Sequence, residues 1–87
     1  MSATEIAEAV VSRLTPDGLR ESILYLAAQR RTDAESGVPI HRIVEELLGG
    51  RDLGTGPEAW SAELRIRRAI REGVSQTPGL TYVEGDA

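Results

Sequence analysis

Residues 57–72 read PEAWSAELRIRRAIRE, and the spacing of their apolar side chains decides how this chain folds. Apolar residues recur every three or four positions, which predicts a helix that buries one face. With about 100° of rotation per residue, that face holds Ala59, Ala62, Ile66, Ala69 and Ile70. A second face mixes aromatic, aliphatic and basic side chains, namely Trp60, Leu64, Arg67 and Arg71, with Arg68 beside them. The helix is therefore expected to pack on one side and to present a different chemistry on another.

This helix has sequence signals at both ends. Thr55 and Glu58 have the spacing of a capping box, and Pro57 suits the first helical turn. Gly73 is expected to end the helix. Before it, the four glycines of residues 49–56 predict a flexible loop. That loop has neither of the glycine patterns of phosphate-binding loops, so a nucleotide site is not expected there.

The segment after the helix has the pattern of a small β-hairpin. Residues 74–76 and 80–84 are short enough to be its two strands. Thr77, Pro78 and Gly79 form a turn sequence between them. The sequence therefore predicts a C-terminal two-stranded hairpin whose tip carries Thr77 and Gly79.

Three more helices are expected nearer the N-terminus. Residues 3–14, 16–31 and 39–48 each carry apolar side chains at helical spacing. A very short edge strand is expected over residues 38–40, where a proline is tolerated. In the second of these helices, two residues are expected to widen the apolar stripe, Leu24 and Tyr25. The predicted fold class is mainly α, with a small C-terminal β-hairpin.

The first of these helices has an apolar stripe that fits two roles. Ile6, Val10 and Leu14 recur at helical spacing along it. Such a stripe either packs on the edge of the core or pairs with a second copy of the chain. The sequence leaves both roles open, and a homodimer formed through residues 1–14 is carried forward as an expectation.

Length and composition exclude several classes of protein. The chain has 87 residues, of which 40% are hydrophobic, and this fits one domain with one modest core. Cysteine is absent, which excludes disulfides and thiolate zinc sites. No apolar run approaches the roughly 20 residues that span a bilayer. Glu5 and Glu8 lie where a signal peptide would carry basic residues, so a cytoplasmic protein without a membrane partner is expected.

Catalytic chemistry finds little support in the sequence. His41 is the only histidine, and no nucleophile is paired with a base at a recognisable spacing. Glu45 and Glu46 are adjacent, so their side chains diverge on a helix and cannot share a proton. Neither an enzyme nor a bound metal or cofactor is expected.

Residues 17–84 resemble the winged-helix family of helix-turn-helix domains. The resemblance rests on the order of the expected elements, which is helix, short strand, helix, loop, helix and hairpin. In that family the helix before the hairpin is the recognition helix, and the hairpin is the wing. The resemblance implies recognition by residues 60–71 and a wing tip at residues 77–79, with residues 1–14 as an additional N-terminal helix. The loop before the recognition helix is longer than the turn of three or four residues in a simple helix-turn-helix.

The resemblance implies binding to double-stranded DNA in transcriptional or replicative control. Arginine supplies both phosphate contacts and bidentate contacts to guanine. The residues expected at the DNA are Arg65, Arg67, Arg68, Arg71, Thr77 and Gly79. The net charge of -4 opposes indiscriminate binding to nucleic acid. The alternative for the arginines is a solvated face, in which Arg67 pairs with Glu63 and Arg68 with Glu72 at i,i+4 spacing.

Trp60 distinguishes two further interpretations. A lone tryptophan is usually mostly buried, and in that case Leu64 would join it in the core. If both side chains are exposed, they have the composition of a protein-binding hot spot. The alternative function is therefore a winged-helix adaptor that binds another protein, and not nucleic acid, through Trp60, Leu64 and the stripe of the first helix.

Overall fold

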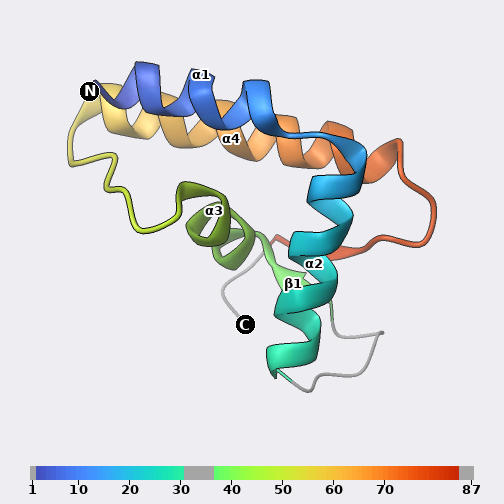
Figure 1. The fold of residues 1–87 in the computed structure, drawn as a ribbon. Helices are drawn as coiled ribbons and strands as arrows, with labels where there is room; N and C mark the ends of the chain where they lie inside the picture. Colours follow the sequence, from blue (N-terminus) through green and yellow to red (C-terminus); the bar gives the residue numbers. More distant parts are fainter. Residues whose placement is uncertain (1, 31–36, 85–87) are drawn as a thin grey trace.

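The computed structural model describes residues 2–30 and 37–84, which form a mainly helical fold with one small sheet (Figure 1). The helices are α1 (Ala3–Arg13), α2 (Pro16–Arg30), α3 (Ile40–Leu48) and α4 (Pro57–Ser75). The strands are β1 (Val38–Pro39) and β2 (Tyr82–Val83). The mainly helical fold class is confirmed, as are the first three helices and the short strand, to within a residue at each end that the structure describes. The predicted end of the second helix, Arg31, lies outside the described residues.

Helices α1 and α4 lie side by side and run in the same direction, although α2 and α3 separate them in the sequence (Figure 1). Ser2 caps α1, because its Oγ accepts a hydrogen bond from Glu5 N at 3.2 Å. Glu58 at the start of α4 also reaches this end of α1, and its Oε1 accepts hydrogen bonds from Thr4 N at 3.3 Å and Thr4 Oγ1 at 3.1 Å. A carboxylate is stabilised there by the positive end of the α1 dipole.

The expected capping box at the start of α4 is wrong. Gly56 is the N-cap, with φ at 110°, a conformation that glycine adopts at little cost. Within the described residues no side chain caps this end of α4, since Glu58 turns instead toward α1. Pro57 is the first residue of the helix, as expected.

Helix α2 turns away from the end of α1 and passes beside β1 (Figure 1). Thr15 is its N-cap as expected, since its Oγ1 accepts a hydrogen bond from Gly18 N at 3.0 Å. The buried stripe of this helix consists of Leu19, Ile23 and Leu26. The expectation that Leu24 and Tyr25 widen that stripe is wrong, because they are 57% and 52% exposed. They point to the side of α2 opposite Leu19 and Ile23.

One aliphatic core joins the four helices and β1. Its largest fully buried side chains are Leu19, Val38, Ile40, Ile43, Ile66 and Ile70. On α4 the buried residues are Ala59, Ala62, Ile66, Ile70 and Val74. This confirms the predicted core face of that helix, on which Ala69 is half-buried.

The prediction that Gly73 ends α4 is wrong, because the helix continues to Ser75. A Cβ atom at Gly73 would lie 2.6 Å from Leu19 Cδ2 and 3.6 Å from Leu14 Cδ2. Leu19 is fully buried, so it has little freedom to move aside. The glycine therefore allows α4 to approach the start of α2 closely.

The predicted C-terminal hairpin is wrong. Residues 74 and 75 belong to α4, and β2 pairs in parallel with β1, with Val38 opposite Tyr82 and Pro39 opposite Val83. The Thr77 hydroxyl donates to the Gly73 carbonyl at 2.8 Å, which fastens the turn to the end of α4. Leu80 is buried in the core. The segment therefore returns along the core to β1, and the described residues contain no wing.

The stripe of α1 lies inside the molecule. Ile6 and Val10 are buried and Leu14 is half-buried, because α1 packs along α4. The expectation that this stripe forms a homodimer surface is wrong for these three side chains, since they already pack within the chain. Self-association through the first helix is not tested by these contacts and stays a prediction. Among the described residues, no helix is both long and apolar enough to cross a membrane.

Candidate interaction surface on helix α4

The outer face of α4 exposes two large apolar side chains. Trp60 is 65% exposed and Leu64 is 37% exposed. They follow each other at i,i+4, so they form one patch on the side of the helix away from the buried alanines. The interpretation of Trp60 as a core residue is therefore wrong, and the alternative, an exposed pair, is confirmed. We call Trp60 and Leu64 the outer patch.

Arg65 is held by α1. Its Nε lies 2.9 Å from Glu8 Oε1, and its Nη2 donates to Glu8 Oε2 at 3.5 Å. The hydrogen bonds from the guanidinium lower the pKa of the Glu8 carboxyl and raise the pKa of Arg65. Both side chains remain in contact with solvent, so the pair neutralises charge more than it stabilises the fold.

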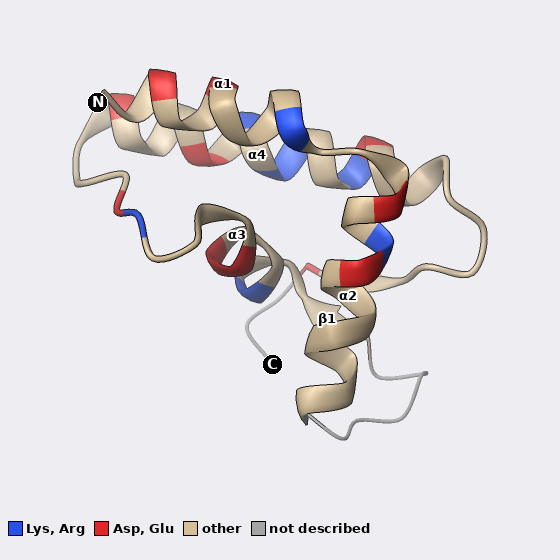
Figure 2. Cartoon of the chain, in the orientation of Figure 1, with Lys and Arg blue, Asp and Glu red and all other residues tan. Residues whose placement is uncertain are grey.

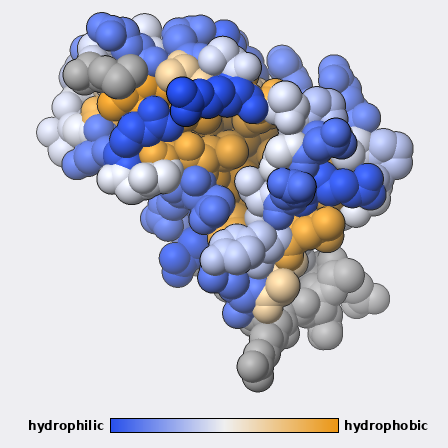
Figure 3. Space-filling view, in the orientation of Figure 1, coloured by the Kyte–Doolittle hydropathy of each residue, from blue (hydrophilic) through white to orange (hydrophobic). Residues whose placement is uncertain are grey.

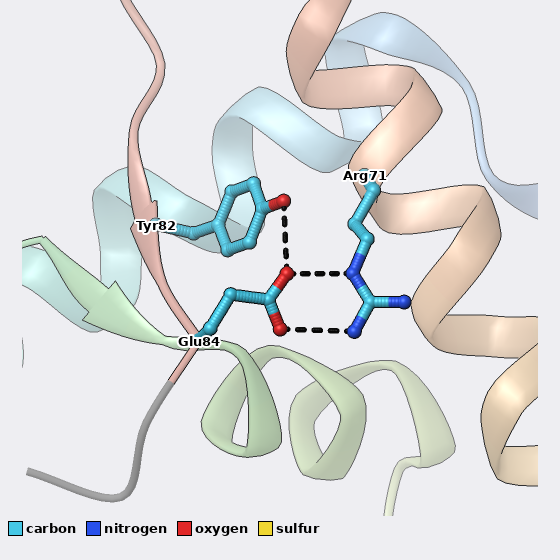
Figure 4. A network of polar contacts seen from close by, with 3 residues as sticks. All are labelled: Arg71, Tyr82 and Glu84. Carbon is cyan, nitrogen blue, oxygen red and sulfur yellow. Dashed lines mark hydrogen bonds and ion pairs between the residues drawn. The ribbon is translucent and has the colours of Figure 1, made fainter.

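Arg71 is held by the segment that follows β2 (Figure 4). Its Nε and Nη2 donate to the two oxygens of Glu84 at 2.6 and 2.9 Å. The Tyr82 hydroxyl donates to Glu84 Oε1 at 3.2 Å. The hydrogen bonds from Arg71 lower the pKa of Glu84, and burial together with the bond to Glu84 raises the pKa of Tyr82. Such a two-bond arginine–carboxylate pair is geometrically specific.

The remaining two arginines differ from each other. Arg67 Nε lies 3.8 Å from Glu63 Oε2, which confirms the predicted i,i+4 pair. The second predicted pair, between Arg68 and Glu72, is not among the ion pairs of residues 2–30 and 37–84. Arg68 is exposed beside Leu64. Within the described part of the chain, three of the four arginines thus face a carboxylate and Arg68 does not.

The charge pattern around α4 is mixed. Figure 2 shows acidic segments toward the N-terminal ends of α1 and α4 and basic segments further along both helices, with another acidic segment near the end of α4. Glu8, Glu63 and Glu84 come from three different segments, yet each reaches an arginine of α4. An anionic ligand such as a phosphate would therefore have to displace carboxylates and would remain close to them.

A groove lies next to the outer patch. It has a volume of about 590 Å³ and is enclosed by the end of α3, residues 51–56 and the first turns of α4. Leu48, Leu53 and Ala59 supply apolar surface, and Trp60 forms one side. Figure 3 shows apolar side chains recessed among hydrophilic ones near the centre of the molecule. An exposed tryptophan beside a hollow with apolar walls is the composition of a binding site for a partner side chain.

The two residues predicted at the wing tip have no common site with the arginines. Thr77 is half-buried, and its hydroxyl is engaged by the Gly73 carbonyl. Gly79 is exposed in the turn after it, with φ at 87°, a left-handed conformation that favours glycine. Because the hairpin does not form, neither residue lies on a wing.

Sequence reasoning missed the residues that control the arginines. Glu8 and Glu84 lie 57 and 13 residues from their partners, and no local spacing marks either pair. The described residues contain no group of three or more His, Asp or Glu side chains placed to hold a metal ion. Comparisons with protein-family models, curated proteins and solved structures found no match to this chain.

Proposed function

We propose that this chain is a small protein-interaction module that binds its partner through the outer face of α4. The exposure of Trp60 carries this proposal. It is the only tryptophan in the chain, and it lies exposed on a helix that the core holds in place. Tryptophan is among the residues that contribute most to protein interfaces when they become buried there.

The composition around Trp60 supports the same function. Leu64 extends the apolar surface by one helical turn, and the exposed Arg68 follows one turn later. Aromatic and arginine side chains are enriched in protein interfaces, whereas acidic and lysine side chains are depleted. The adjacent groove offers a concave surface into which a partner side chain fits.

DNA binding, the function that the family resemblance implies for this surface, finds weaker support. Its affinity rests on arginines that neutralise phosphates. Arg65, Arg67 and Arg71 each have a carboxylate within 4.0 Å, and the expected wing is absent from the described residues. A phosphate backbone laid on this face would meet nearly as much negative as positive charge.

We propose that the core is a variant of the winged-helix fold. The order of α2, β1, α3, α4 and β2 supports this assignment, and so does the pairing of β1 with the C-terminal strand. Two features depart from the family pattern, namely the long loop over residues 49–56 and a single parallel strand in place of the hairpin. The missing hairpin removes the wing, one of the two surfaces that the family uses on DNA, and leaves the outer face of α4 as the other.

Site-specific photo-crosslinking in the native host tests the proposed function. A photoreactive phenylalanine analogue replaces Leu64, and in a control chain it replaces Arg20, which is exposed on α2. We expect a discrete protein adduct from position 64 that is absent from position 20 and disappears when Trp60→Ala is added. Adducts to nucleic acid alone, or no adduct that depends on Trp60, would contradict the proposal.

A further inference from the structure

We infer that the groove beside Trp60 binds a basic segment of a partner protein, with an apolar side chain in the groove and a lysine or arginine at its rim. This inference rests on the proposed function and specifies the chemistry of the partner. It follows from the shape of the groove and from the charges around it.

The floor of the groove is suited to an apolar side chain. Leu48 and Ala59 are buried and Leu53 is half-buried, so the floor is formed by core residues. The indole of Trp60 stands at the edge, where an incoming side chain would cover it. A volume of about 590 Å³ lies within the range of small-ligand pockets, and it is ample for one aliphatic side chain.

The rim of the groove is acidic. Glu45, Asp52 and Glu63 line it, and Arg51 is the only basic side chain among the described residues around it. Arg51 turns back to the end of α3, where its Nε donates to the Leu48 carbonyl at 2.8 Å. Its charge therefore acts on the negative end of the α3 dipole.

Asp52 is exposed, and its Oδ1 accepts a backbone hydrogen bond from Gly54 N at 2.8 Å. Glu45 and Glu63 lie 3.6 and 3.8 Å from Arg42 and Arg67 on their own helices. A cation in the groove would therefore compete with those two arginines.

Helix ends contribute little to the net field in the groove. The end of α3 and the beginning of α4 both line it, and their dipoles have opposite signs there. Glu58 in the first turn of α4 further offsets the positive end of that helix. The side chains of the rim therefore determine the sign of the field. The lining holds three carboxylates against Arg51, which favours a cation that pairs with Asp52 directly and shares Glu45 and Glu63 with their arginines.

Trp60 strengthens the preference for a basic segment. A lysine or arginine beside an indole face gains a cation–π interaction in addition to its attraction to carboxylates. An acidic segment would gain neither. The net charge of -4 also favours association with a basic partner over a second copy of the chain, which would bring the same acids to the interface.

The intrinsic fluorescence of the 87-residue chain provides the test, because Trp60 is its only tryptophan. The probes are three capped dodecapeptides, composed of arginine and leucine, of arginine and serine, and of glutamate and leucine. We expect the arginine–leucine peptide to shift the Trp60 emission to shorter wavelength, with an affinity that falls as salt is added. The arginine–serine peptide should bind more weakly, and the glutamate–leucine peptide should not bind.

A matched pair of variants separates the groove from general attraction to an acidic protein. Glu45→Gln with Asp52→Asn removes two rim charges, and Asp17→Asn with Glu21→Gln makes the same change on α2. The variant cannot form the two exposed ion pairs that we expect between the peptide and residues 45 and 52. The arginine–leucine peptide should therefore bind it roughly fivefold more weakly than the wild type. The α2 variant should bind as the wild type does.

Several outcomes overturn the inference without touching the proposed function. Equal binding of the arginine–leucine and glutamate–leucine peptides would do so, and so would equal weakening by the two variants. No emission shift with any peptide would also overturn it. If a Trp60-dependent protein adduct still forms at position 64, the proposed function stands and only the chemistry of the partner is wrong.

Discussion

The two faces of α4 share one backbone and have opposite environments. The inner face buries Ala59, Ala62, Ile66 and Ile70 under α1 and against the core. The outer face exposes Trp60 and Leu64 and carries Arg71, which Glu84 from the segment after β2 holds in place. Small and β-branched side chains thus fix the position of the helix, while large and charged ones are presented on it. Stability and binding can therefore be altered separately on this helix.

Substitutions of aliphatic residues on the two faces should have very different effects. Ile66 is fully buried, so Ile66→Ala should lower the free energy of unfolding by about 2–5 kcal/mol through reduced burial and a cavity. Leu64→Ala, two residues away on the outer face, should cost less than about 1 kcal/mol. Urea denaturation of both variants measures the difference. Equal losses would show that the outer face is buried in solution.

Gly73 tests how closely the inner face approaches α2. Gly73→Ala should destabilise the fold by about 1–2 kcal/mol, because the new Cβ meets Leu19 and the clash outweighs the gain in helix propensity. Gly18→Ala is the matched control, since its Cβ would meet no core side chain and only Thr15 Oγ1, the exposed capping oxygen of α2, at 3.1 Å, so it should cost less. Thermal unfolding followed by circular dichroism separates them. A more stable Gly73→Ala variant would mean that α4 and α2 are less tightly packed.

The attachment of β2 to the outer face should depend on pH. Arg71 lowers the pKa of Glu84 below its unfolded value, so the ion pair contributes stability above that value and loses it as pH falls through the folded pKa. We expect the protection of the Tyr82 and Val83 amides, measured relative to their intrinsic exchange rates at each pH, to fall in acid, below pH of about 4. Glu84→Gln should remove most of this dependence.

Glu8→Gln is the control for that experiment, because Glu8 also has a lowered pKa but pairs with Arg65 at α1. It should leave the exchange of Tyr82 and Val83 unchanged. Protection at β2 that does not change between neutral and acid pH in the wild-type chain would contradict a role for the Arg71–Glu84 pair in holding the strand.

The outer patch should matter least for stability. Trp60→Ala should change the free energy of unfolding by less than about 0.5 kcal/mol, because the side chain is 65% exposed. Urea denaturation measures it by circular dichroism, since the variant lacks a tryptophan. A large loss would indicate that Trp60 packs within the chain, and the proposed binding role would then lose its basis.

Features set by local spacing could be predicted from the sequence. The core face of α4, the Thr15 cap and the short strand after residue 37 all follow from periodicity or from one residue type at a fixed position. Gly73 could not be interpreted correctly, because glycine serves both to end a helix and to let two helices approach. The hairpin prediction is wrong for the same reason, since a longer α4 leaves too few residues for a first strand.

Contacts between residues far apart in the chain could not be predicted from the sequence. Glu8 meets Arg65 only because α1 lies along α4, and Glu84 meets Arg71 only because β2 pairs with β1. The sequence therefore shows that the arginines are clustered, but it does not show that Glu8 and Glu84 neutralise two of them. The exposure of Trp60 likewise depends on where α1 packs, which its amphipathic pattern left open.

Whether the outer face of α4 binds protein or DNA is decided most directly by a titration of fluorescent duplex DNA at several salt concentrations. The two chains compared are the wild type and an Arg67/Arg68/Arg71→Ala variant. We expect weak binding or none, and the same salt dependence for both chains. Two results together would contradict a protein-binding face. The wild-type affinity would fall steeply with salt, and the log–log slope of the variant would be smaller by roughly 0.9 for each arginine–phosphate interaction that it lacks.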